Sequence, residues 1–137
     1  IQKARYHNIV MLAAAGNQGT KGKLDFPARY PETTAVTATG KTDQLASFSN
    51  TGRDASLAAP GEKITSSWNN GATRELSGTS MAVPHAAGTA ALLLAMNPHL
   101  SPSDIDSIMR GGRTSLKGIS GMGIGMINAH NSVQMLR

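Results

Sequence analysis

The spacing of apolar and polar residues changes along the chain. Residues 1–8 ("IQKARYHN") have the polarity of the last turns of a helix, and 9–17 ("IVMLAAAGN") form an apolar run that ends in a Gly-Asn turn. Such a run is typical of a buried strand. Residues 33–39 ("TTAVTAT") predict a second strand. Because a helix leads straight into a strand at residue 1, we expect an earlier part of the domain to precede this chain.

The middle of the chain predicts shorter pieces. Residues 46–52 ("ASFSNTG") and 54–61 ("DASLAAPG") predict short strands with turns. The segments "KITSSW" (63–68) and "ATRELS" (72–77) flank an Asn-Asn-Gly turn. This arrangement is a signal for a β-hairpin.

From Ser80 to Met96 the residues are nearly all small or apolar, and they predict a helix. A helix that is apolar on nearly every side is expected to be buried on nearly every side. We place Pro84 in the first turn, where a missing N–H costs little, and Asn97-Pro98 at the end. Since no apolar run approaches the ~20 residues that cross a bilayer, we expect no membrane span.

Two further helices follow. Ser101 is the expected N-cap of the first, with Asp104 three positions later, and Gly111-Gly112 ends it. Residues 127–136 ("INAHNSVQML") predict the last helix. Strands that alternate with helices indicate an α/β fold with a doubly wound, mainly parallel sheet. No linker or repeat divides residues 1–137, so we expect one domain.

Composition narrows the possible functions. The chain has no cysteine, which excludes disulfides, thiolate metal ligands and a cysteine nucleophile. No His/Asp/Glu cluster has transition-metal spacing. The net charge of +5 comes from scattered Lys and Arg, with only 4% aromatic residues. This favours a solvated basic surface and no nucleic-acid partner, and binding to polyanions is the weakest of our functional hypotheses.

Ser80 stands where the predicted helix begins. The first turn of a helix offers unpaired N–H groups and the positive end of the helix dipole. A serine there can attack a carbonyl carbon while its own N–H helps to hold the oxyanion. Gly78 lets a substrate backbone approach, and Thr79 keeps the turn small. The alternative is that Ser80 is an ordinary N-cap.

Asn17 ends the first predicted strand, a point at which α/β sheets usually place ligands. Its side-chain amide could donate a second hydrogen bond to an oxyanion. The alternative is a turn asparagine in a left-handed conformation.

Several segments together resemble the subtilisin-like serine proteases, in the order of that family: "AAAGNQG" (13–19), "FPARYP" (26–31), "ASFSNTG" (46–52), "AAPG" (58–61), "GTSMAVPHAAG" (78–88) and "GMGIGMINAH" (121–130). The resemblance implies that the chain is the C-terminal part of a subtilisin-like catalytic domain. It implies Ser80 as the nucleophile of a secreted endopeptidase, and Asn17 as a donor to the oxyanion beside the Ser80 N–H. The resemblance implies that the reaction needs no cofactor.

The catalytic Asp and His of that family come earlier in its sequence than the segments found here. The resemblance therefore implies a partner, an N-terminal fragment of the same protease, left bound after an autoproteolytic cut. A propeptide and a polypeptide substrate are the other implied partners. His85 is a structural residue in the family's signature, and we do not expect it to be the base. The alternative is a non-catalytic relative that acts as a binding or regulatory module.

The resemblance also implies a substrate pocket, walled by Ala14, Ala15 and Gly16, with Thr79 nearby and Asp25 at its floor. An acidic floor favours a substrate Lys or Arg through charge-assisted hydrogen bonds. The alternative is a loop aspartate paired with Lys23 or Arg29.

A weak structural cation site, for Ca²⁺ or Na⁺, is the last expectation from the resemblance. It would be formed by backbone carbonyls of Ala28, Tyr30 and Thr33.

Overall fold

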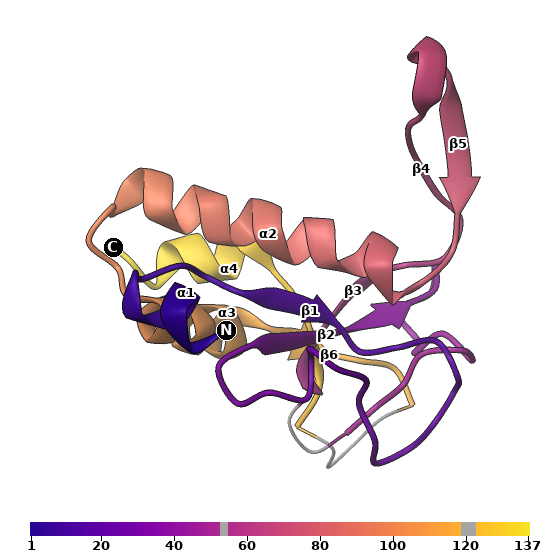
Figure 1. The fold of residues 1–137 in the computed structure, drawn as a ribbon, viewed down its shortest axis with the longest axis horizontal. Helices are drawn as coiled ribbons and strands as arrows, with labels where there is room; N and C mark the ends of the chain where they lie inside the picture. Colours follow the sequence, from indigo (N-terminus) through magenta and orange to yellow (C-terminus); the bar gives the residue numbers. More distant parts are fainter. Residues whose placement is uncertain (53–54, 119–122) are drawn as a thin grey trace.

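A five-stranded sheet in the order β1-β2-β3-β7-β6 forms the centre of the computed structural model, which describes residues 1–52, 55–118 and 123–137 (Figure 1). Its first four strands run parallel and β6 pairs antiparallel with β7. The strands are β1 (Leu12–Ala14), β2 (Thr34–Thr39), β3 (Ala55–Pro60), β6 (Thr114–Ser115) and β7 (Gly125–Met126). The expected α/β fold with a mainly parallel sheet is confirmed. Residues 119–122, at the start of the 121–130 motif, and residues 53–54 lie outside the described part.

Strand β2 is buried along its whole length, because both faces of the sheet are covered. Successive side chains of a strand point to opposite faces. Val36 packs on one face with Ala82 and Ala86 of helix α2 (Thr79–Met96), and Ala35 packs on the other with Leu24 and Ala28 from the loop after β1. The hydroxyl of Thr37 donates to the carbonyl of Leu57 (3.2 Å), so this buried polar group is satisfied.

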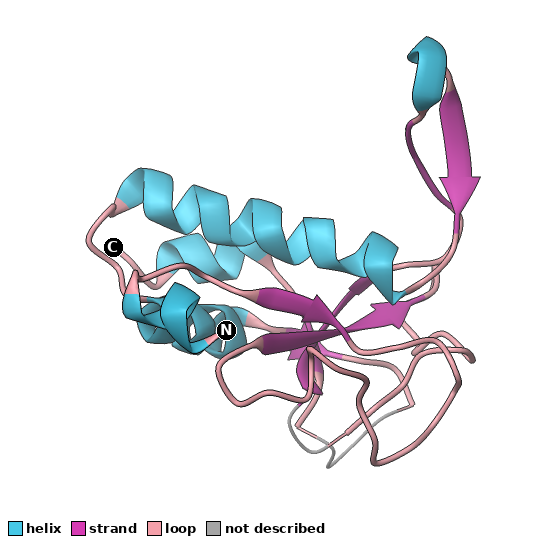
Figure 2. Ribbon diagram, in the orientation of Figure 1, coloured by secondary structure: helices cyan, strands magenta, loops and turns pink. Residues whose placement is uncertain are grey.

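Helix α2 (Thr79–Met96) lies along one face of the sheet (Figure 2). The expectation that it is buried on nearly every side is wrong, because only one stripe meets the sheet: Thr79, Ala82, Ala86, Thr89, Ala90 and Leu93. Leu92 and Met96 on other faces are 52% and 48% exposed. The helix is long and apolar enough to cross a membrane by length and composition (mean hydropathy 1.3). Of its 18 residues 33% are buried, and they pack against the sheet.

The expected position of Pro84, in the first turn of the helix, is also wrong. It lies in the second turn of α2, since the helix begins at Thr79. A proline there leaves the helix without one internal hydrogen bond. Its side chain is exposed.

The remaining helices are α1 (Gln2–Tyr6), α3 (Pro102–Gly112) and α4 (Ala129–Gln134). The predicted start of α3 is confirmed as a full capping box, in which Ser101 and Asp104 each bind the other's backbone N–H. Helix α4 is shorter than predicted, because Asn128 caps it and accepts from the N–H of Asn131.

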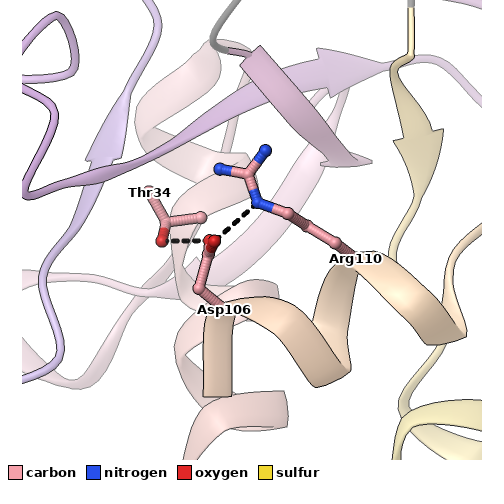
Figure 3. Close-up of polar contacts among 3 residues, drawn as sticks. All are labelled: Thr34, Asp106 and Arg110. Carbon is pink, nitrogen blue, oxygen red and sulfur yellow. Dashed lines mark hydrogen bonds and ion pairs between the residues drawn. The ribbon is translucent and has the colours of Figure 1, made fainter. Parts of the chain in front are cut away.

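A polar contact joins α3 to the start of β2 (Figure 3). The Thr34 hydroxyl donates to Oδ1 of Asp106, and Nε of Arg110 donates to Oδ2 of the same carboxylate, each at 2.6 Å. Because Asp106 and Arg110 are one helical turn apart, α3 presents both to the strand end.

The predicted hairpin is confirmed as β4 (Ile64–Ser67) and β5 (Thr73–Leu76), joined by the short 3-10 turn Asn69–Gly71. It projects away from the sheet and returns to the start of α2 (Figure 1). Asn70 adopts φ 58°, a conformation that asparagine tolerates better than most residues. The hairpin therefore leads directly into the segment that carries Ser80.

Candidate active site

Ser80 lies in the first turn of α2, but it is not the N-cap. Gly78 occupies the N-cap position, and its carbonyl accepts from the N–H of Met81 (3.0 Å). The alternative interpretation of Ser80 as a capping residue is therefore wrong. Ser80 itself is exposed while its neighbour Thr79 is fully buried. The turn thus presents the Ser80 hydroxyl outward.

Asn17 is bonded to this turn through its side-chain oxygen. Oδ1 of Asn17 accepts from both the backbone N–H and the hydroxyl of Thr79, each at 2.9 Å. The Thr79 hydroxyl in turn accepts from the N–H of Gly16 (3.2 Å). Because a backbone N–H can only donate, the oxygen of the Asn17 amide must face Thr79. The NH₂ group therefore points away from it.

Two hydrogen-bond donors are consequently free beside the Ser80 hydroxyl. Within residues 1–52, 55–118 and 123–137, no acceptor binds Nδ2 of Asn17 or the backbone N–H of Ser80. Asn17 and Ser80 line the same cavity, of about 520 Å³. Two such donors at a helix N-terminus can stabilise the negative charge that develops on a carbonyl oxygen under attack.

The cavity also brings together most of the predicted substrate-binding residues, which are Ala14, Gly16, Asp25 and Thr79. Ala15 does not line it. Its side chain is fully buried and packs with Leu24 and Ala28, because neighbouring side chains of an extended segment point to opposite sides. The expected role of Ala15 as a wall is corrected. Its carbonyl instead accepts from the N–H of Asp25 (3.0 Å), which joins this segment to the loop that carries Asp25.

The Asp25 carboxylate lies against the backbone of Gly16. A Cβ at Gly16 would collide with it, and Gly16 also adopts φ 108°, which disfavours any side chain. Neither Lys23 nor Arg29 forms an ion pair with Asp25, and the Arg29 guanidinium lies 5.6 Å from the centre of the Phe26 ring. Pairing with Lys23 or Arg29 is therefore not realised.

His85 lies on the same helix and lines a second cavity of about 350 Å³ with Ser80, Met81 and Pro84. Its Nδ1 lies 3.1 Å from the carbonyl oxygen of Met81. Since that oxygen can only accept, Nδ1 carries the proton and the ring is bound to its own helix. This contact suits the structural role that the family resemblance implies for His85.

The loop expected to bind a cation closes on itself. The carbonyl of Tyr30 accepts from both the N–H (3.0 Å) and the hydroxyl (2.8 Å) of Thr33. The carbonyl of Pro27 accepts from the same hydroxyl (3.0 Å) and from the N–H of Tyr30 (3.0 Å). The Thr33 hydroxyl has one proton, so it donates to one of these two carbonyls at a time, and the cation site stays a prediction. In the described part of the chain, no group of three or more His, Asp or Glu could hold a metal.

Asn50 is a residue of the site that sequence reasoning missed. It is 1% exposed and bonded to the loop that carries Asn17. The motif at residues 46–52 marked this segment, but no local pattern predicts that it reaches a loop distant in sequence.

The chain matches known proteins over nearly all its length. The model of the subtilase family matches residues 1–121. The chain is 38% identical to Subtilisin E of Bacillus subtilis (strain 168) and to the subtilisin of Bacillus pumilus, and the match covers 98% of this chain in both cases. It spans 36% and 50% of the length of those relatives.

Solved structures agree with this. A cold adapted subtilisin-like serine proteinase superposes with a TM-score of 0.87 at 34% identity, over 93% of this chain and 48% of that one. The Prenylagaramide maturation protease superposes with a TM-score of 0.89 at 30% identity, over 99% of this chain and 54% of that one. Together with the family match, these likenesses show that the chain belongs to the subtilase family.

Proposed function

We propose that this chain is the nucleophile-bearing part of a serine endopeptidase that hydrolyses peptide bonds through an acyl-enzyme on Ser80. The observation that carries the proposal is the orientation of Asn17. Its oxygen is held by two hydrogen bonds from Thr79, so its NH₂ group is free at the cavity that Ser80 lines. Asn17 is not among the described residues with a positive φ, so the alternative of a left-handed turn asparagine does not describe it.

The proposed reaction begins with attack of Ser80 Oγ on the carbonyl carbon of the scissile peptide. A histidine base takes the hydroxyl proton, and the carbonyl oxygen becomes an oxyanion that accepts from the Ser80 N–H and from Nδ2 of Asn17. The C–N bond then breaks, and the proton passes to the leaving amine. Water, activated by the same base, releases the acid and restores the Ser80 hydroxyl.

The histidine base and the aspartate that orients it belong, in this proposal, to an N-terminal segment of the same protease. The relatives are two to three times longer than the match, which leaves room for such a segment. His85 is a poor substitute, because it follows Ser80 by more than a full turn on the same helix, and among the described residues no hydrogen bond joins the two side chains. The exposed face of α2 that begins at Ser80 and includes Leu92 offers an apolar surface to this partner. Secretion, a propeptide and autoproteolytic maturation are further parts of the proposal, drawn from the family.

We also propose a preference for Lys or Arg before the scissile bond. Asp25 lines the same cavity as Ser80, and its carboxylate abuts Gly16 on the cavity wall. Among the described residues no cation pairs with it. A substrate ammonium or guanidinium group would supply the missing charge. Each of the proposed steps is carried by protein groups, so we propose no cofactor.

A fluorophosphonate probe tests the activity. The protease assembled from this chain and the N-terminal segment should be labelled at Ser80, and the Ser80→Ala variant should not. Labelling elsewhere, or none, would favour the non-catalytic alternative. Rates on peptides with Lys or Arg before the cut, compared with Leu or Phe, test the preference. A Phe preference would overturn the role of Asp25 while leaving the nucleophile in place.

A further inference from the structure

Asn50 makes more hydrogen bonds than any position of the proposed machinery, although it lines neither of the two cavities described at Ser80. Its Oδ1 accepts from the N–H groups of Gln18 and Thr20, both at 3.0 Å. Its Nδ2 donates to the carbonyl of Ala15 (3.3 Å) and to Oε1 of Gln18 (2.7 Å). Both atoms of the amide therefore use their full bonding capacity inside the protein.

All of these partners belong to one loop, residues 15–20, which we call the oxyanion loop because it carries Asn17. Backbone bonds reinforce the connection. The N–H of Asn50 donates to the carbonyl of Gly16 and the N–H of Thr51 to that of Thr20, both at 2.9 Å. The segment around Asn50 therefore holds both ends and the middle of the oxyanion loop.

Asn17 itself is not bonded to Asn50, but both of its neighbours are. Gly16 and Gln18 are bonded to Asn50 on one side of the loop, while Asn17 reaches across to Thr79 on the other. The direction of the Asn17 side chain follows from these two anchors. If the Asn50 anchor is removed, the hydrogen bonds to Thr79 must hold the loop alone.

We propose that Asn50 is a positioning residue for the oxyanion donor, acting through the oxyanion loop. The inference rests on the proposed function of Asn17. If Asn50 had a purely structural role, its substitution should have the same effects as substitution of its buried neighbour Ser49. The Ser49 hydroxyl is also buried, accepts from the N–H of Ala38 (2.9 Å) in β2 and donates to the backbone carbonyl of Asn50 (3.3 Å), but it has no bond to the oxyanion loop.

Asn50→Ala should lower kcat more than it changes KM for small peptide substrates. The loop N–H groups of Gln18 and Thr20 lose their acceptor, and the loop can shift. Since a 1 Å displacement of a catalytic group can cost about 100-fold, we expect kcat to fall by about 10- to 100-fold.

A double-mutant cycle with Asn17→Ala separates positioning from general damage. Rates are measured on the assembled protease and divided by the fraction of Ser80 that a fluorophosphonate labels, so that unfolded protein is not counted. In the Asn17→Ala background, adding Asn50→Ala should change kcat by about twofold or less, because the group it positions is gone. Ser49→Ala should lower the melting temperature and leave kcat per labelled site unchanged. An equal loss of kcat in both backgrounds, or no loss in either, would overturn the inference.

Asn50→Asp provides a second variant should Asn50→Ala fail to fold. It has the same shape and keeps the acceptor for Gln18 and Thr20, but it loses both donated bonds. The same cycle and the same outcomes apply. A readout independent of activity is the ¹⁵N resonance of the Asn17 side-chain amide, which should shift in Asn50→Asp and not in Ser49→Ala. If this resonance does not shift, the inference about Asn50 is overturned, whatever the reactivity of Ser80. An unreactive Ser80 in the wild-type protease would by itself count only against the proposed function.

Discussion

Oδ1 of Asn17 accepts two hydrogen bonds from Thr79, one from its backbone N–H and one from its hydroxyl, each at 2.9 Å. The two residues lie at the end of a strand and at the start of a helix, far apart in the sequence. This contact decides which end of the Asn17 amide is free. It also places the free NH₂ group beside the turn that carries Ser80.

Loss of the Thr79 hydroxyl should therefore weaken transition-state stabilisation. Thr79→Val keeps the backbone N–H bond to Asn17 but removes the second bond, so we expect kcat of the assembled protease to fall about tenfold with little change in KM. Loss of the equivalent Asn in a subtilisin costs about 100- to 1000-fold, which bounds the effect from above. Thr79→Ser should restore most of the rate.

Thr89→Val is the matched control for Thr79→Val. Thr89 is also a buried threonine of α2, and its hydroxyl donates to the carbonyl of His85 in the preceding turn. It makes no contact with Asn17. If Thr89→Val lowered kcat as much as Thr79→Val, the orientation of Asn17 would not be the cause.

Neutralising Asp25 should reduce the preference for basic residues. For Asp25→Asn we expect kcat/KM on Lys and Arg peptides to fall by about 10- to 100-fold, because a hydrogen bond to a charged group is lost, while Leu and Phe peptides change much less. Steady-state rates on paired peptides measure this. Asp43→Asn, an exposed site with the same change in net charge, should leave the ratio unaltered. Equal losses on all peptides would contradict a pocket role for Asp25.

Gly16→Ala should destabilise the protein more than a comparable change elsewhere. A Cβ at Gly16 would meet the Asp25 carboxylate and the Asn50 amide, and the residue has φ 108°. Gly22→Ala is the control, since Gly22 has φ 81° and no atom within 4 Å of the added carbon. We expect the control to lose about 1 kcal/mol of unfolding free energy and Gly16→Ala to lose clearly more. If chemical denaturation gives equal losses of unfolding free energy for both variants, the loop accommodates the added carbon at Gly16 without an extra penalty.

The capping box of α3 predicts a pH dependence. Hydrogen bonds from the Ser101 hydroxyl, and then from its backbone N–H, lower the pKa of Asp104 below its ordinary value. A lowered pKa in the folded state adds stability above the unfolded pKa, and this contribution disappears as the pH falls through the folded pKa. Asp104→Asn should therefore be less stable than wild type near neutral pH, and the difference should disappear as the pH falls below about 4 and through the lowered pKa of Asp104. A difference that stays constant over this range would contradict the assignment.

Local patterns were sufficient for much of the fold. The capping box at Ser101, the hairpin around Asn70 and the strand 33–39 each depend on residues close in the sequence, and each is confirmed. The burial of α2 was predicted wrongly. Its uniform apolar composition does not say which side meets the sheet, because that depends on what packs against it.

The sequence also placed Ser80 and Asn17 as candidates, since a small polar residue at a helix start and an amide at a strand end are recognisable locally. It left open whether Ser80 was an N-cap, which way the Asn17 amide faced and whether Asp25 paired with Lys23. Those answers depend on contacts between segments brought together only by folding: Asn17 with Thr79, Asp25 with Gly16, and Asn50 with the oxyanion loop. A hydrogen bond forms only where its donor and acceptor atoms lie about 3 Å apart. The distance between two residues in the sequence does not say whether their atoms come that close. Only the tertiary structure could therefore decide these contacts.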